Sequence, residues 1–190
     1  MRIAVTGGIA DGKSTVCSIL AEMGYKVVSA DDVVSELYAD TAIIDRVKSE
    51  FGDQIANHRA IDRAALRREI TDDTTARAKL NAIFHPAVMR EILEKTDTAE
   101  AAFAEVPLLI ETTTQGWFDE VWVVAAGVDE QRKRLIKRLG SGEAADALLA
   151  TQLPTDAKIP FADRVIRTNV PVETVKSTIA GHVKELLGQR

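Results

Sequence analysis

Short apolar runs alternate with amphipathic stretches along this chain of 190 residues. The apolar runs are rich in β-branched residues, as is typical of buried strands, and they lie at 3–6, 25–29, 102–106, 120–125 and 164–166. Between them, apolar residues recur at the spacing of amphipathic helices. Alternating strands and helices predict an α/β fold, in which helices cover both faces of a parallel sheet.

The second and third predicted strands are separated by about seventy residues, which is too many for a single crossover connection. The gap therefore predicts an inserted helical subdomain. Its first helix should end at Gly52, and a second helix should begin after Asp62, a preferred N-cap residue. A third helical pattern covers 74–94, where Pro86 should bend or split the helix.

A second excursion separates the fourth and fifth predicted strands. Its first helix is basic, and Arg134 and Arg138 share one face because they are four residues apart. Gly140-Ser141-Gly142 should end this helix, and a helix of small residues follows to about Gln152. The segment is either a hinged basic flap that closes over an anion or an ordinary solvated surface. A final helix is predicted from 172 to 187.

The first predicted strand leads into Gly7-Gly8-Ile9-Ala10-Asp11-Gly12-Lys13-Ser14, which fits the P-loop pattern G-x-x-x-x-G-K-[ST]. An apolar stripe that starts at Val16 predicts a helix directly after the loop. Strand, loop and helix together predict a site for a nucleoside triphosphate. Backbone N–H groups and the helix N-terminus attract phosphate oxygens, Lys13 adds a positive charge, and Ser14 can reach a magnesium ion.

Carboxylates follow the second and third predicted strands, at the edge of a parallel sheet where ligands bind. Asp31 or Asp32 could accept the proton of an attacking hydroxyl, or hold magnesium through water. Alternatively, one of the two simply caps the helix expected near Val33. Pro107 should end the third strand, and Glu111 beyond it is either a ligand-facing carboxylate or a solvated helix residue.

Composition narrows the class of protein. The formal net charge of −5 argues against a nucleic-acid partner, so that any phosphate affinity must be local. The single cysteine, Cys17, excludes an internal disulfide and is expected in the core. Because no apolar run approaches the length of a membrane span, we expect a soluble cytoplasmic protein with no membrane partner. The three histidines have no metal-site spacing, and His85 is expected to be partly buried unless Pro86 turns it toward a cleft.

Taken in order, these residues resemble the dephospho-CoA kinase family over nearly the whole chain. Residues 6–8 and 12–15 match its Thr-Gly-Gly and Gly-Lys-Ser-Thr elements, and Ser29-Ala30-Asp31 matches its Asp-Ala-Asp element. Further matches are Phe51-Gly52, residues 61–63 with Leu66, His85-Pro86, residues 106–109 with Glu111, Phe118-Asp119, Gln131, Arg134-Leu135, Arg138, Gln152, Lys158 and Ala162-Asp163.

The resemblance implies a three-layer αβα P-loop NTPase fold with a five-stranded parallel sheet, a helical insertion that receives dephospho-CoA, and a lid over ATP. The nucleotide-binding core would comprise residues 1–31, 86–133 and 159–190, the insertion residues 32–85, and the lid residues 134–158. The implied reaction transfers the γ-phosphate of ATP, with Mg²⁺, to the ribose 3′-hydroxyl of dephospho-CoA. ATP and dephospho-CoA would be its partners, and a monomer or weak homo-oligomer is expected.

The same resemblance implies roles for individual residues. Asp31, rather than Asp32, would deprotonate the acceptor hydroxyl, and Arg138 would steady the transferring phosphoryl group. Ser14 would ligate magnesium, and the residues expected to contact ATP are Gly8, Ile9, Ala10, Asp11, Gly12, Lys13, Ser14, Thr15 and Arg134. The residues expected on the acceptor side are Thr6, Asp31, Arg63, His85, Pro107 and Glu111.

Three positions depart from the family pattern. Ala10-Asp11 replaces a common Gly-Ser, Leu148 replaces an Arg of the lid helix, and Thr168 replaces an Asn after the last strand. We expect Asp11 on the rim of the loop, facing solvent, where its charge would weaken ATP binding modestly. Two alternatives remain: another small P-loop kinase acting on a nucleoside or nucleotide, and a non-catalytic ATP-binding regulator.

Overall fold

The computed structural model describes residues 1–56, 59–71, 73–97 and 100–188. The contacts of the chain divide it into two compact units. One consists of Met1–Val28 with Thr96–Arg190, and the other is Ser29–Lys95. Each unit is described by itself below.

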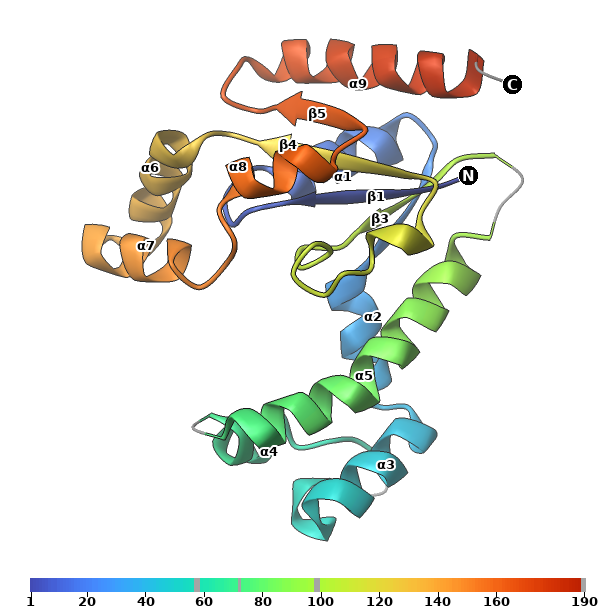
Figure 1. Cartoon of the computed structure of the whole chain (residues 1–190), viewed down its shortest axis with the longest axis vertical. Coiled ribbons are helices and arrows are strands. Elements are labelled where there is room, and N and C mark those ends of the chain that lie inside the picture. Colours follow the sequence, from blue (N-terminus) through green and yellow to red (C-terminus); the bar gives the residue numbers. More distant parts are fainter. Residues whose placement is uncertain (57–58, 72, 98–99, 189–190) are drawn as a thin grey trace. The chain divides into compact units, whose positions relative to one another are not determined.

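A five-stranded parallel sheet forms the centre of the fold (Figure 1). Its strands are β1 (Arg2–Gly7), β2 (Lys26–Ser29), β3 (Ala102–Glu105), β4 (Glu120–Ala125) and β5 (Arg164–Arg167), in the order β2-β3-β1-β4-β5. β1 pairs in parallel with β3 and β4, and β4 pairs in parallel with β5. The predicted α/β sheet is therefore confirmed. Because β1 is central, the loop that follows it emerges in the middle of the edge where such sheets bind ligands.

Helices flank this sheet in the first unit. They are α1 (Lys13–Glu22), α6 (Val128–Leu139), α7 (Gly142–Leu149), α8 (Thr155–Lys158) and α9 (Val172–Gly188), with short 3₁₀ turns η2 (Gln115–Trp117) and η3 (Ile159–Phe161). The buried sides of α1 and α9 form one apolar core with the sheet. In this core the rings of Phe103 and Trp122 pack edge to face, with their centres 5.1 Å apart. Figure 1 shows α6 and α7 beyond the end of β4.

The basic excursion between β4 and β5 breaks where the sequence predicts. α6 ends at Gly140, whose φ of 75° lies in the left-handed region that glycine adopts without strain. Ser141 then caps α7, because its hydroxyl accepts a hydrogen bond from the N–H of Ala144 at 3.2 Å. The predicted final helix is α9.

The second unit is helical. Its elements are α2 (Ala30–Leu37), α3 (Thr41–Phe51), η1 (Asp53–Ile55), α4 (Arg63–Ile70) and α5 (Thr74–Lys95). Asp62 caps α4 as predicted, and the bonds donated by the N–H groups of Ala65 and Ala64 lower the pKa of its carboxyl. Lys95 pairs with Glu36 and so links α5 to α2.

α5 continues through Pro86 as one helix, so the predicted split is wrong. Pro86 lies on the exposed side of the helix, while Phe84, Ala87 and Val88 on either side of it are buried. These buried side chains hold both halves of the helix on the same core, which outweighs the hydrogen bond that proline cannot donate.

Within the described part of the chain, no helix combines the length and the apolar character that crossing a membrane requires.

Candidate active site

The loop between β1 and α1 has the backbone of a phosphate-binding loop. Gly12 has a φ of 91° and Ala10 a φ of 60°, both in the left-handed region that lets successive N–H groups turn toward one point. α1 begins at Lys13, as predicted, so that the positive end of its dipole lies at the loop. The loop can therefore attract an anion before any side chain contributes.

The side chain of Lys13 lies along the same loop. Its Nζ donates to the carbonyl oxygen of Gly8 at 2.8 Å and to that of Gly7 at 3.3 Å. The flexible stem of lysine allows the ammonium group to exchange these carbonyls for phosphate oxygens. Lys13 thus occupies the place that its expected role requires.

Asp11 is fully buried, so the expectation that it faces solvent on the rim is wrong. Its carboxylate accepts hydrogen bonds from the N–H of Gly8 at 2.6 Å, from the N–H of Ala126 at 2.8 Å and from the hydroxyl of Thr155. Three donors compensate the buried charge. Asp11 therefore ties the loop to the segment after β4 and to α8, and the N–H of Gly8 is already engaged inside the protein.

Thr168, the other departure that touches the loop, also has a defined partner. Its hydroxyl donates to the carbonyl oxygen of Asp11 at 2.5 Å and accepts from Arg134 at 3.3 Å. The departures at Asp11 and Thr168 therefore belong to one network of hydrogen bonds beneath the loop.

Gly8 leaves no room for a side chain. A Cβ at this position would lie 2.5 Å from Thr155 Oγ1, 2.6 Å from Gln131 Nε2 and 3.0 Å from Asp11 Oδ2. We expect Gly8→Ala to weaken ATP binding about tenfold, because overpacking would push these partners and the loop apart. Calorimetric titration with ATP measures the effect, and Gly116→Ala is the control, since no described atom lies within 4 Å of a Cβ there. Unchanged affinity in Gly8→Ala would contradict the requirement for a close loop.

A cavity of about 520 Å³ opens beside the loop. Residues 10 and 12–15 line it on the loop side, Arg134 and Arg138 on the α6 side, and Val170 and Val172 after β5. The cavity thus offers positive charge together with apolar surface, which suits the phosphates and the planar base of a nucleotide.

The two arginines of α6 that line the cavity differ in their contacts. Arg134 donates to the carbonyl oxygens of Ala10 at 3.1 Å and Thr168 at 2.6 Å, and pairs with Glu130 at 3.0 Å. The interpretation of α6 as a merely solvated face is therefore wrong for Arg134. Arg138 is exposed one turn further along the helix, where it also lines the cavity.

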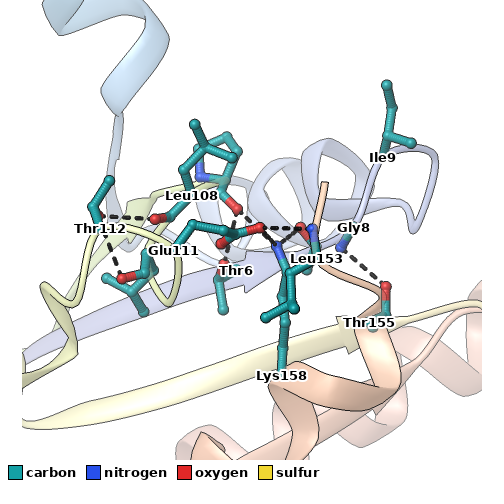
Figure 2. Close-up of polar contacts among 12 residues, drawn as sticks. Thr6, Gly8, Ile9, Leu108, Glu111, Thr112, Leu153, Thr155 and Lys158 are labelled. Carbon is teal, nitrogen blue, oxygen red and sulfur yellow. Dashed lines mark hydrogen bonds and ion pairs between the residues drawn. The ribbon is translucent and has the colours of Figure 1, made fainter. Parts of the chain in front are cut away.

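A buried lysine joins the turn after β3 to α8, as Figure 2 shows. Lys158 is completely buried, and its Nζ contacts Glu111 Oε1 at 2.8 Å, the carbonyl oxygen of Pro107 at 3.2 Å and that of Gly7 at 3.4 Å. The side chain of Glu111 is only 23% exposed. As a whole residue Glu111 is exposed, but it lies in a turn and its carboxylate is the counter-ion of a buried ammonium group, so the interpretation as a merely solvated helix residue is wrong.

The same cluster contains Thr6. Thr6 is fully buried, and its hydroxyl donates to the carbonyl oxygen of Pro107 at 3.3 Å. The N–H of Leu153 donates to Glu111 at 3.3 Å. The structure thus brings together three residues expected on the acceptor side, Thr6, Pro107 and Glu111.

Asp31 belongs to the second unit, where it is exposed in the first turn of α2. The N-cap of this helix is Ser29, whose hydroxyl accepts from the N–H of Asp32 at 3.2 Å. The alternative that an aspartate caps the helix is wrong, because the helix already begins at Ala30. Helix capping therefore does not account for an aspartate at position 31.

Arg63 and His85 also belong to the second unit. The guanidinium of Arg63 lies 4.3 Å from the centre of the Tyr38 ring, a cation–π contact that orients it. His85 is exposed on α5, so the expectation of a partly buried histidine is wrong.

Ser14 fits the expected magnesium site. It is exposed at the second residue of α1 and lines the cavity. Among the residues that the structure describes, no three His, Cys, Asp or Glu side chains gather as a metal site. Magnesium that is bound together with phosphates needs only one or two oxygen ligands from the protein. The hydroxyl of Ser14 can supply one of them.

Sequence reasoning missed two polar residues, Thr155 and Glu105, and gave Gln131 no role beyond its match to the family pattern. Thr155 and Gln131 contact the loop from α8 and α6, and Glu105 ends β3 beside Cys17 of α1. Burial and the nearby Glu105 raise the pKa of the Cys17 thiol far above its usual range, which agrees with Cys17 as an inert core residue. A signal for Glu105 was available, namely a carboxylate at the end of a buried strand.

The sheet order, the loop after β1 and the helix that begins at Lys13 define a protein of the P-loop α/β class. A shikimate kinase from Acinetobacter baumannii has the same fold, with a TM-score of 0.59 and 16% identity over 100% of this chain and 94% of that one.

Closer similarity identifies the family. The family model described as dephospho-CoA kinase matches residues 1–173. A dephospho-CoA kinase from Streptococcus mutans is 35% identical over 97% of this chain and 96% of the relative. The crystal structure of TT1252 from Thermus thermophilus has a TM-score of 0.80 and 30% identity, covering 98% of this chain and 97% of that one. The chain therefore belongs to the dephospho-CoA kinase family, and the resemblance seen in its motifs is confirmed.

Proposed function

We propose that this chain transfers the γ-phosphate of ATP to the ribose 3′-hydroxyl of dephospho-CoA, giving ADP and coenzyme A. Family membership supports the reaction. The observation that carries the proposal is the P-loop, which opens with Lys13 and Ser14 onto a cavity that also receives Arg134 and Arg138. Phosphoryl transfer depends mainly on positioning and on stabilising negative charge, and this cavity provides both.

On the ATP side, backbone N–H groups of the loop and the N-terminus of α1 would hold the phosphates. Lys13 would leave the carbonyl oxygens of Gly7 and Gly8 to bind them. Arg138 would contact the transferring group, while Arg134, held by Ala10 and Thr168, would keep the loop and α6 together. Magnesium bound by Ser14 and the phosphates would withdraw charge from the phosphoryl oxygens.

On the acceptor side, Asp31 would orient the 3′-hydroxyl and accept its proton. We assign residues 32–85 to dephospho-CoA binding, with Arg63 and His85 as contacts, and residues 134–158 to a lid. Asp31 follows β2 by two residues, as the P-loop follows β1 directly, and residues after strands of a parallel sheet are the usual source of ligand contacts. The enzyme would act in the cytoplasm as a monomer or weak homo-oligomer.

A coupled assay of ADP release tests the proposal. With ATP and magnesium, we expect turnover with dephospho-CoA, coenzyme A as the product in mass spectrometry, and no turnover with adenosine or AMP. Turnover with adenosine or AMP alone would favour another small P-loop kinase. ATP binding without turnover on any acceptor would favour a regulator.

A further inference from the structure

Lys158 is a buried cation that the proposed reaction does not use. Its side chain has no solvent exposure, and an ammonium group that is withdrawn from water is costly unless it is paired and hydrogen-bonded. The three N–H groups of lysine match three oxygens here: Glu111 Oε1 at 2.8 Å, Pro107 O at 3.2 Å and Gly7 O at 3.4 Å. Figure 2 shows this cluster between α8 and the turn after β3.

The contact with Gly7 matters because two lysines share that carbonyl oxygen. Lys13 Nζ lies 3.3 Å from it and Lys158 Nζ lies 3.4 Å from it, on side chains from opposite ends of the first unit's sequence. In a P-loop the N–H groups bind phosphate only while the carbonyl groups stay turned away from it. Whatever holds the Gly7 carbonyl therefore helps to set the direction of the loop's N–H groups.

The two lysines differ in what ATP would do to them. Lys13 is half-buried and, in the proposed function, moves to the phosphates, which removes its hydrogen bond from Gly7. Lys158 is the last residue of the segment assigned to the lid, and there it is enclosed and held by Glu111 and Pro107, so this end of the segment stays in place. Leu153 N–H binds the same Glu111 oxygen and adds a second restraint from the segment before α8.

We propose that Lys158 is a positioning residue that holds the Gly7 carbonyl when Lys13 turns to ATP, and so keeps the P-loop in its phosphate-binding shape. Glu111 serves as its counter-ion. This inference rests on the proposed binding of ATP at the loop. The competing explanation is a buried ion pair that only stabilises the fold.

Four variants separate the two explanations, each studied by calorimetric titration with ATP in the absence of acceptor and by thermal unfolding. Lys158→Met removes the charge at similar side-chain length, and Glu111→Gln keeps an oxygen for Lys158. The double variant Lys158→Met/Glu111→Gln leaves no unpaired charge. Arg164→Met is the control, because Arg164 forms a pair of comparable burial with Glu120 at 3.0 Å between β5 and β4.

For a positioning residue, we expect Lys158→Met to bind ATP at least tenfold more weakly, and the double variant to regain stability but not affinity. Glu111→Gln should bind ATP within about threefold of the wild type, since its amide oxygen still accepts from Lys158. Arg164→Met should lose stability and keep its ATP affinity.

Wild-type ATP affinity in the double variant would overturn the proposal, and so would its failure to fold, because either result makes the role of Lys158 structural. Equal loss of ATP affinity in Arg164→Met would overturn it too. The proposed function is tested separately by the wild-type protein, and it fails if that protein binds no ATP. A loss of ATP affinity that occurs only in the variants leaves the proposed function intact.

Discussion

Asp31→Asn is expected to reduce kcat about a hundredfold to ten-thousandfold, the usual contribution of a general base, while ATP affinity stays unchanged. The amide has nearly the shape of the carboxylate but cannot accept the hydroxyl proton. Helix α2 should remain intact, because Ser29 and not Asp31 caps it. Initial rates with saturating dephospho-CoA, together with calorimetric titration by ATP, measure the two quantities separately.

Asp32→Asn is the matched control for this prediction. Asp32 is the next residue of the same helical turn and is also exposed, so the change in charge and in helix dipole interaction is the same. We expect the Asp32 variant to retain most of its turnover. Loss of turnover in Asp32→Asn with full turnover in Asp31→Asn would move the base to Asp32.

Asp11→Ala is expected to lower the free energy of unfolding by about 3 kcal/mol, because several buried donors lose their acceptor at once. The N–H groups of Gly8 and Ala126 and the hydroxyl of Thr155 all point at this carboxylate. Urea denaturation followed by the fluorescence of the buried Trp122 measures the change. ATP affinity should fall as well, since Gly8 loses a partner that fixes its orientation.

Asp45→Ala provides the comparison, because Asp45 is exposed on α3 and its removal should change stability by no more than about 0.5 kcal/mol. The result that would contradict our interpretation is a stable Asp11→Ala protein that binds ATP more tightly. Such a protein would restore the view of Asp11 as a charge that repels phosphate.

Local patterns predicted most of the secondary structure because helix ends are encoded by neighbouring residues. Asp62 caps α4 through N–H groups two and three residues away, and Gly140 with Ser141 breaks α6 from α7. Pro86 shows the limit of local rules. Its effect on α5 depends on what the neighbouring side chains pack against, and the sequence does not state that.

The candidate site shows the same difference between what local sequence predicts and what depends on distant residues. The P-loop could be found because the backbone of its glycines and the side chains of its lysine and serine serve one phosphate site and lie within eight residues of sequence. The ion pair of Glu111 and the exposure of His85 could not be inferred in this way. Exposed and paired carboxylates look alike in a sequence, and Glu111 finds its counter-ion 47 residues away (158 minus 111).

By itself, the sequence determined a phosphate-binding loop on a parallel α/β sheet, the two helical excursions and membership of a kinase family. Only the tertiary structure decided what surrounds that loop. Asp11 meets Thr155 across 144 residues, and Lys158 meets Gly7 across 151. A buried charge is stable only when its partners enclose it, and those partners come together only when the chain folds. Judged from its charge alone, Asp11 should repel phosphate. In the folded protein its carboxylate instead holds the loop in place through buried hydrogen bonds.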